Sequence, residues 1–341
     1  MGYSVEKIDT SNAPETVLVE LAQLCDVLDA EDLPDDPPTP IEARIQRWRH
    51  PLDHWREHHW IARDNGDLFA HGLVEYHRDQ NLENAFFRIE THPASRRRGL
   101  ASVLVVPIFE HLAEHGRGRI ATWIKEGSEA EGFAAKLGLK RVYNEKRSRL
   151  TIADLDVELM SRWIERASER ASDYDLLELE GPIPEEIIQR YCDLALVMNT
   201  APREDMEEED LVLTPKDWRE IEAVTAASKK RLHTIIAVHR PTGEFAGYTT
   251  LMTQDLDPTI AWQWETGVDP AHRNQGLGRW IKAANILRVI NSHPAVTRVD
   301  TYNAGSNEPM LSINIEMGFE VIQVDNHWQG PLGEAREALG V

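Results

Sequence analysis

Apolar and polar residues follow the same pattern twice along the 341-residue chain. Each half opens with a strand pattern, YSVEKID from Tyr3 or YDLLELE from Tyr174, followed by an amphipathic helix and an acidic loop. A tryptophan-containing helix and a hairpin come next, and the hairpin turns contain Asn65-Gly66 and Thr242-Gly243, as tight turns prefer. The sequence therefore predicts an internal repeat, in which each copy combines helices with hairpin strands.

A glycine-containing turn joins a strand to a helix in the second part of each copy. SRRRGLASV occupies residues 95–103 and HRNQGLGRW occupies residues 272–280. Pro93 and Pro270 precede these turns, at an offset of 270 − 93 = 177 residues. Each copy then continues with a strand, a helix stopped by glycine and a last strand. Chance similarity would not keep so many kinds of element in one order.

The repeat predicts two domains of the α+β class, at residues 1–152 and 174–341. Residues 153–173 have apolar positions at helical spacing and are predicted to form a linker helix. The hydrophobic content of 41% is enough for two cores, and the chain length suits two domains. The alternative is a single α/β domain with fortuitous internal similarity.

Composition and charge narrow the classes of partner. The formal net charge of −21 argues against nucleic acid and anionic membranes, which both need basic surface, and is compatible with cationic small molecules. Only Cys25 and Cys192 are present, so we expect no disulfide framework and a cytoplasmic location. No apolar run reaches the roughly 18 residues of a membrane span, and the N-terminus lacks the apolar region of a signal peptide.

The glycine turn of the second copy is suited to binding a diphosphate. The first turn of a helix offers free N–H groups and a partial positive charge. Gly276 and Gly278 have no Cβ, so an anion can approach the main chain, and Arg273 adds charge. A dinucleotide-binding G-x-G-x-x-G loop would need a third glycine where Ile281 stands, and no P-loop is present. An ordinary strand-to-helix turn is the alternative interpretation.

The segments VDPAHRNQGLGRWIK and DTYNAGSNEPMLSINIEMGF resemble the GCN5-related N-acetyltransferase (GNAT) family, and the duplicated layout resembles its tandem members. The family motif V-x-P-x-x-R-x-x-G-x-G/A is matched in the second copy by Val268, Pro270, Arg273, Gly276 and Gly278. The first copy is a weaker match, with a threonine in place of the valine, and matches at Pro93, Arg96, Gly99 and Ala101. The resemblance covers nearly the whole chain.

The resemblance implies two tandem GNAT-like domains, each a mixed, mostly antiparallel twisted sheet flanked by helices. It implies acetyl-CoA as the cofactor, with its pyrophosphate on the N–H groups of residues 274–278 and its pantetheine arm between strands 262–268 and 298–302. The cofactor-binding residues that it implies are Val268, Arg273, Asn274, Gln275, Gly276, Leu277, Gly278, Asn303 and Asn307 in the second copy, and Arg96, Arg98, Gly99 and Ala101 in the first. Asn303 and Asn307 are equally expected as loop and helix-cap residues.

Acetyl transfer to an amine needs a neutral nucleophile and a base that removes its proton. With a pKa near 10, only about 0.1% of an alkylamine is neutral at pH 7, a cost of roughly 4 kcal/mol. Glu265 is the candidate base, and strand alternation places it on one face with Gln263. The first copy has Arg88 at the aligned position, with Glu90 beside it, and is therefore predicted to be degenerate. A solvated or ion-paired strand carboxylate is the alternative role for Glu265.

At the position of the general acid, this sequence differs from the family pattern. Many members place a tyrosine four residues before the terminal Gly-Phe or Gly-Leu, where this chain has Asn314 and Ala134. Either Tyr302 protonates the leaving thiolate or the thiolate leaves unprotonated, since a thiol pKa of about 8.5 makes the acid helpful rather than essential.

The expected function is therefore acetyl-CoA-dependent N-acetyl transfer to a small, cationic amine in the C-terminal domain. The acidic loop at residues 203–210 favours a cationic acceptor, and a solvated loop is its alternative. The alternative function is a catalytically silent acyl-CoA-binding sensor or scaffold. We expect a monomer or homodimer with no nucleic-acid or membrane partner. No metal site is predicted, because the histidine pairs His54/His58 and His111/His115 lack a third ligand.

Overall fold

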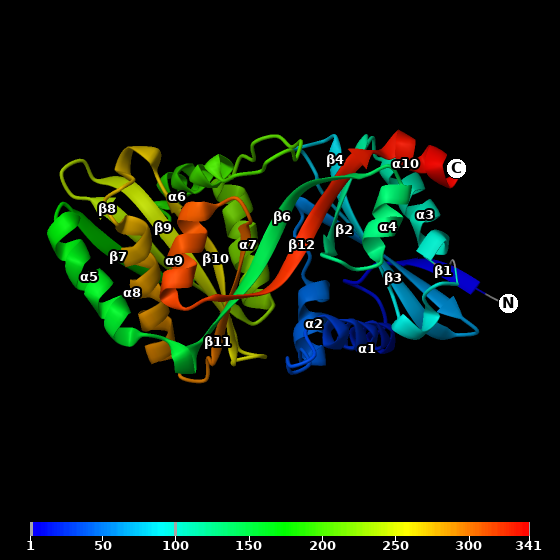
Figure 1. The fold of residues 1–341 in the computed structure, drawn as a ribbon, viewed down its shortest axis with the longest axis horizontal. Coiled ribbons are helices and arrows are strands. Elements are labelled where there is room, and N and C mark those ends of the chain that lie inside the picture. Colours follow the sequence, from blue (N-terminus) through cyan, green and yellow to red (C-terminus); the bar gives the residue numbers. More distant parts are fainter. Residues whose placement is uncertain (1–2, 99–100, 341) are drawn as a thin grey trace. The chain divides into compact units, whose positions relative to one another are not determined.

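The computed structural model describes residues 3–98 and 101–340, which form two compact units. Unit 1 contains Met1–Val142, Met206–Glu209 and Asn326–Val341, and unit 2 contains Tyr143–Asp205 and Asp210–Asp325. Each unit is a sheet with helices on both faces (Figure 1). The predicted class of two mixed, mostly antiparallel α+β units is confirmed.

Unit 1 is built around a sheet in the order β1-β2-β3-β4-β5, followed by β12. Neighbours from β1 to β4 are antiparallel, and β4 and β5 are parallel. The helices α1 and α2 pack on one face and α3 on the other. The elements of this unit are β1 (Tyr3–Ile8), α1 (Glu15–Asp32), α2 (Ile41–Arg49), β2 (Trp55–Asp64), β3 (Asp67–His77), β4 (Asn84–Thr91), α3 (Ala101–Glu114), β5 (Arg119–Lys125), α4 (Ala130–Lys136) and α10 (Leu332–Leu339).

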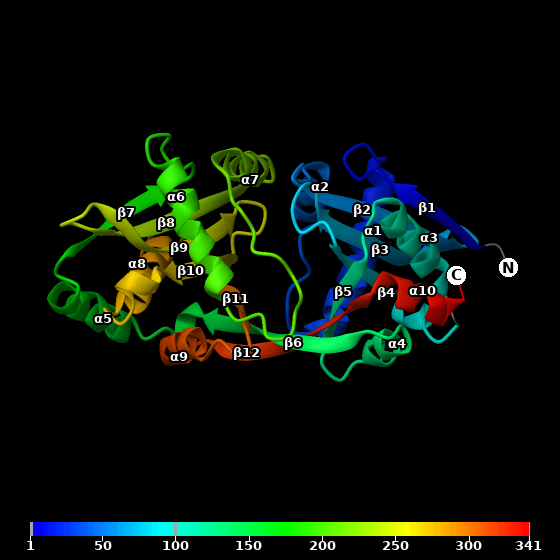
Figure 2. The same cartoon turned by 90° about the horizontal axis from the view of Figure 1, so that it is seen from above.

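Unit 2 has the sheet order β6-β11-β10-β9-β8-β7, in which only β10 and β11 are parallel. Figure 2 shows α6 and α7 on one side of this sheet and α5 and α8 on the other. The elements are β6 (Lys140–Thr151), α5 (Val157–Arg170), β7 (Tyr174–Glu180), α6 (Ile188–Ala195), α7 (Pro215–Ala227), β8 (Lys230–His239), β9 (Glu244–Gln254), β10 (Ile260–Val268), α8 (Leu277–Ser292), β11 (Arg298–Ala304), α9 (Glu308–Met317) and the first part of β12 (Glu320–Pro331).

The central strands of unit 2 are apolar on both faces because helices cover both. In β8, Ile235 packs with α8, whereas Ile236, the next residue, packs with α6 and α7. Such a strand appears in the sequence as a continuous apolar run rather than as an alternation. The helix predicted at 153–173 is α5, whose first N–H groups are capped by Asp156. Its Trp163 lies in the core with α8, so this helix is part of unit 2.

The last strand of each half belongs to the sheet of the other unit. β6 comes from the N-terminal half, yet residues 145–151 pair with β11 in unit 2. β12 comes from the C-terminal half, yet it follows β5 in the strand order, and its residues from Asn326 onward belong to unit 1. The predicted boundaries at residues 152 and 174 did not anticipate this exchange. The apolar pattern of a strand shows that it pairs but not with which neighbour.

Candidate functional site

The two parallel strands of unit 2 separate part of the way along. β10 and β11 pair only as far as Gln263 and Thr301. Beyond these residues β10 stays paired with β9, and β11 stays paired with β6. The separation between residues 264–268 and 302–304 is called the wedge below. Both arms of the wedge carry main-chain groups that have lost one neighbouring strand.

A β-bulge shapes the β10 arm of the wedge. The register with β9 moves from Gln263↔Leu251 to Thr266↔Thr249, so β10 has one extra residue, and Glu265 lies within the bulge. The predicted alternation, with Gln263 and Glu265 on one face, is wrong for this reason. Gln263 Nε2 donates to Thr249 Oγ1 at 3.1 Å, whereas Glu265 meets the preceding residue of β9 on the opposite face.

Glu265 is held by a buried tyrosine. The hydroxyl of Tyr248 donates to Glu265 Oε2 at 2.5 Å, and Tyr248 itself packs against Tyr191 beneath α6. Burial raises the pKa of Glu265, and the hydrogen bond from Tyr248 partly offsets that rise. A carboxylate with a raised pKa is a stronger base, and Oε1 has no partner among the described residues. The geometry is suited to proton abstraction.

The turn after β10 presents unpaired amides. Asn274 and Gly276 have positive φ angles of 66° and 81°, and Gly276 is the N-cap of α8. In the described part of the chain, the N–H groups of residues 274–279 donate to no protein acceptor. A Cβ added at Gly276 would meet no atom within 4 Å, so the space before these amides is open. This arrangement fits an anion with several oxygen atoms.

Arg273 and Gly278 support the turn rather than facing outward. Arg273 donates through Nε to the carbonyl of Val268 at 3.1 Å and through Nη2 to Thr200 Oγ1 at 2.9 Å. A Cβ on Gly278 would lie in ordinary van der Waals contact with Ile313 of α9, at 3.5 Å. The side chain of Arg273 therefore ties the turn to the end of β10.

The β11 arm separates its candidate residues onto two faces. Tyr302 stacks on Trp262 with ring centroids 6.0 Å apart, and burial raises the pKa of Tyr302, which makes it a weaker acid. Asn303 lies on the other face and accepts a hydrogen bond from Asn314 Nδ2 at 2.6 Å. Asn307 caps α9 by accepting from the N–H of Met310, the structural role that the sequence left open.

A known protein family and several solved structures are similar to this chain. Residues 21–139 match the family described as "Acetyltransferase (GNAT) family". A tandem GNAT protein from the clavulanic acid biosynthesis pathway, solved without AcCoA, has a TM-score of 0.78 at 22% identity over 97% of this chain and 99% of that chain.

Residues 21–139 match the GNAT family, and the chain shares the fold of a tandem GNAT protein. The family that residues 21–139 match is one of acetyltransferases. A GCN5-related N-acetyltransferase from Sphaerobacter thermophilus shares the fold with a TM-score of 0.68 and 13% identity over 97% of this chain and 96% of its own. A glucosamine N-acetyltransferase region of a fungal multi-domain GH3 beta-N-acetylglucosaminidase shares it at 0.65 and 12%, over 96% and 38%. No curated protein matches at a significant level.

The family match falls on the N-terminal half of the chain, where the glycine motif is less complete. In that half β4 and β5 also separate, after Phe86 and Ala121, but β4 pairs with β3 without a bulge. Arg88 forms an ion pair with Glu90 at 3.3 Å. Burial alone would raise the pKa of Glu90, but Arg88 and His71 together lower it to about 2. Glu90 is therefore a poor base.

The arginines of the first glycine turn are paired with acids. Arg96 donates to both carboxylate oxygens of Glu31, and Arg98 donates to Asp64 at 3.2 Å. Ala101 begins α3, and Gly99 lies outside the described residues. The corresponding arginine of unit 2, Arg273, bonds only neutral oxygens.

The strand exchange brings two arginines that sequence reasoning missed into unit 2. Arg147 and Arg149 of β6 both donate to Asp300 of β11, with distances from 2.7 to 3.1 Å. Asp300 is fully buried, and the guanidinium of Arg147 also lies over the rings of Trp262 and Tyr302. No sequence signal pointed to these arginines, because they stand at the end of the other copy.

Asp300→Asn is expected to lower the free energy of unfolding by about 3 kcal/mol, because it leaves two mostly buried guanidinium groups without their carboxylate. Denaturant titration of the full chain measures this change. Asp175→Asn is the matched control, since Asp175 forms an exposed ion pair with Arg240. An equal loss of stability in both variants would contradict the expectation.

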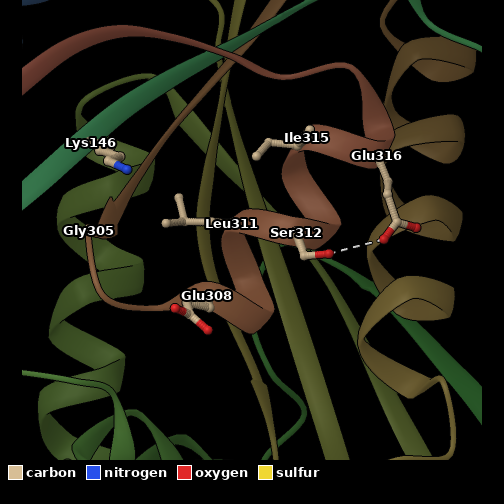
Figure 3. A pocket seen from close by; sticks show the side chains of 7 residues that line it. All are labelled: Lys146, Gly305, Glu308, Leu311, Ser312, Ile315 and Glu316. Carbon is tan, nitrogen blue, oxygen red and sulfur yellow. Dashed lines mark hydrogen bonds between the residues drawn. The ribbon is translucent and has the colours of Figure 1, made fainter.

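Two other features of the chain lie apart from the glycine turn. A shallow hollow on the outer face of α9 is lined by Lys146, Gly305, Glu308, Leu311, Ser312, Ile315 and Glu316 (Figure 3). None of these belongs to the glycine turn. The expectation that the pair His111/His115 lacks a third ligand is wrong, because Glu114 lies close enough to both to share a metal ion. The ammonium of Lys7 is 3.3 Å from Nδ1 of His111. No described helix is long and apolar enough to cross a bilayer.

Proposed function

We propose that this protein is an acetyl-CoA-dependent N-acetyltransferase that moves the acetyl group directly to an amine of a small molecule in unit 2. The observation that carries the proposal is the set of N–H groups at residues 274–279, which have no acceptor among the described residues and lie in the turn after β10 and the first turn of α8. A diphosphate is the anion whose oxygens such a turn accommodates. The acyl arm of the same cofactor then extends along the wedge.

The residues that would hold the cofactor fit this role. Among the described residues, the N–H groups of Asn274, Gln275, Gly276, Leu277 and Gly278 have no acceptor, and they stand at the start of a 16-residue helix, whose dipole adds positive potential. The main chain near Val268 and the amide of Asn303 flank the wedge and would bond the amides of the pantetheine arm. When bound, the cofactor supplies an acetyl thioester as an electrophile.

Glu265 is proposed as the general base. The amine nitrogen attacks the thioester carbon, a C–N bond forms, and its proton passes to Glu265, directly or through one water molecule. The C–S bond then breaks and the electron pair leaves on sulfur. Tyr248 fixes the carboxylate through Oε2, which leaves Oε1 to accept the proton.

Unit 1 is proposed as a degenerate copy with a supporting role. It lacks the bulge, its aligned residue is Arg88, and the neighbouring Glu90 is held in an ion pair. We accordingly assign catalysis to the C-terminal half, together with the strand β6 that the N-terminal half contributes. We also propose a cytoplasmic protein that works as a monomer or homodimer.

We propose a cationic acceptor on the basis of charge. The formal net charge is −21, and Glu204 and Asp205 of the acidic loop are exposed. Other acids of that loop are neutralised, since Glu207 pairs with Arg119 and Asp210 with Arg203. A part of the predicted acidic surface therefore remains for a cation.

Release of free CoA thiol from acetyl-CoA in the presence of a panel of mono- and polyamines tests the proposal, with products identified by mass spectrometry. Transfer to at least one amine is expected, together with stronger transfer to multiply charged amines than to neutral ones. Tight CoA binding without transfer to any amine would overturn catalysis and favour an acyl-CoA-binding sensor. No CoA binding at all would overturn both functions.

A further inference from the structure

A lysine is buried in the core of unit 2 without an acidic partner. Lys282, on the second turn of α8, is 1% exposed. Among the described residues its Nζ contacts Asn314 Oδ1, Met310 Sδ at 3.7 Å and the ring of Phe319 at 5.2 Å. Burial lowers the pKa of Lys282 to about 7. An apolar residue would fill this place at lower cost, so the ammonium needs an explanation beyond packing.

The lysine dictates how two asparagines are oriented. An ammonium group only donates hydrogen bonds, so the atom of Asn314 that faces Lys282 must be its carbonyl oxygen. The amide nitrogen of Asn314 then points away and donates to Asn303 Oδ1 at 2.6 Å. Asn303 is left with its own nitrogen as a donor, which has no acceptor among the described residues. The three side chains form one directed chain of hydrogen bonds.

This chain of hydrogen bonds ends at the wedge. Asn303 belongs to the β11 arm, two residues beyond the last pair with β10. Asn314 stands four residues before Gly318, the position where many family members carry a tyrosine. Because Asn314 is buried and bonded on both sides, it cannot itself act as an acid. The donor that reaches the wedge is the N–H of Asn303, and the positive charge behind it belongs to Lys282.

We propose that Lys282 is a positioning residue for the leaving thiolate, which acts through Asn314 to hold the N–H group of Asn303 as a donor at the wedge. This inference rests on the proposed function. As the C–S bond breaks, sulfur takes the electron pair, and the N–H of Asn303 donates to the developing anion. The amine proton goes to Glu265, and the thiolate later takes a proton from water. A charged group strengthens the hydrogen bonds linked to it.

The affinity of the full-length protein for CoA relative to desulfo-CoA, which lacks only the thiol, tests this inference without an acceptor. Below about pH 7, where Lys282 carries its charge, wild type is expected to gain affinity for CoA over desulfo-CoA, because the N–H of Asn303 donates to the sulfur, and this gain is expected to shrink toward pH 9. In Lys282→Met, which keeps the length of the side chain but removes the ammonium, that gain is expected to fall about tenfold. Equal gains in both proteins would overturn the inference, whereas failure of wild type to bind CoA would overturn the proposed function instead.

Two further variants keep the test decisive if Lys282→Met folds poorly. Asn314→Leu interrupts the chain of hydrogen bonds at its centre and is expected to lose the same gain in affinity for CoA over desulfo-CoA. The double variant Lys282→Met/Asn314→Leu is expected to be no worse than Asn314→Leu alone, because the lysine acts only through the asparagine. Additive losses would overturn the proposed chain.

Asn285→Leu is the matched structural control. Asn285 is buried on the same helix and donates to the carbonyl of His233 at 2.8 Å, away from the wedge. This variant is expected to lower the melting temperature and to leave the preference for CoA over desulfo-CoA unchanged. If it reduces the preference as much as Lys282→Met does, the effect of the lysine is only structural and the inference fails.

Discussion

Glu265→Gln is expected to reduce kcat for acetyl transfer by about 10²- to 10⁴-fold, the usual contribution of a general base, while the Kd for acetyl-CoA stays within about twofold of wild type. Glutamine has the same size and still accepts a hydrogen bond from Tyr248, so the fold is retained. Only the capacity to take a proton is lost. Steady-state kinetics with the best amine of the panel, combined with titration of acetyl-CoA, separates the two quantities.

The pH dependence of kcat/KM is a second test of Glu265 as the general base. The base works only when it is ionised, so kcat/KM is expected to fall as pH decreases through the pKa of Glu265. Burial raises that pKa above the ordinary value for a glutamate, so this fall lies at a higher pH than for an exposed glutamate. The acidic limb should disappear in Glu265→Gln.

Glu90→Gln is the matched control for this experiment. Glu90 lies on β4, near the aligned place in unit 1, and is held by Arg88. Its replacement is expected to leave kcat unchanged. Wild-type turnover in Glu265→Gln would remove this residue as the base, and a large loss in Glu90→Gln would move catalysis to the other half.

Gly276→Asp is expected to weaken CoA binding at least about thirtyfold. The φ of 81° at this position disfavours a side chain, and a carboxylate would stand before the amides that the diphosphate needs. The introduced carboxylate and the diphosphate of CoA are both negative and repel each other, so the diphosphate is kept out of the turn. Calorimetric titration of CoA into the full chain measures the affinity.

Gly243→Asp separates this effect from backbone strain. Gly243 has a φ of 73° in the hairpin between β8 and β9, and a Cβ there also meets no atom within 4 Å. The two variants therefore share the residue change and the backbone conformation but not the location. Unchanged CoA affinity in Gly276→Asp, or an equal loss in Gly243→Asp, would contradict a cofactor site at this turn.

The glycine turn was predictable because its conformation is encoded locally. A positive φ at Gly276 and the start of a helix directly after it follow from the residue types alone. The bulge at Glu265 was not predictable, since no glycine or proline marks it, and one extra residue reversed the face expected for the carboxylate. The existence of β10 was visible in the sequence, but its register was not.

The burial of Lys282 illustrates a second limit. A lysine on a helix is usually predicted to face solvent, and the apolar pattern around it does not show that α9 and Phe319 cover it. Arg147 and Arg149 illustrate a third, because a strand's pattern does not name the sheet that it joins. The contacts of Lys282, Arg147 and Arg149 depend on segments that are far apart in the sequence, so the sequence pattern alone does not predict them.

The exchanged strands make the two copies mutually dependent during synthesis and evolution. A polypeptide that started at residue 174 would leave the free edge of β11 exposed and would lack the guanidinium groups that neutralise Asp300. The first copy would thus be needed even without catalytic activity of its own, because its last strand, β6, completes the sheet of unit 2.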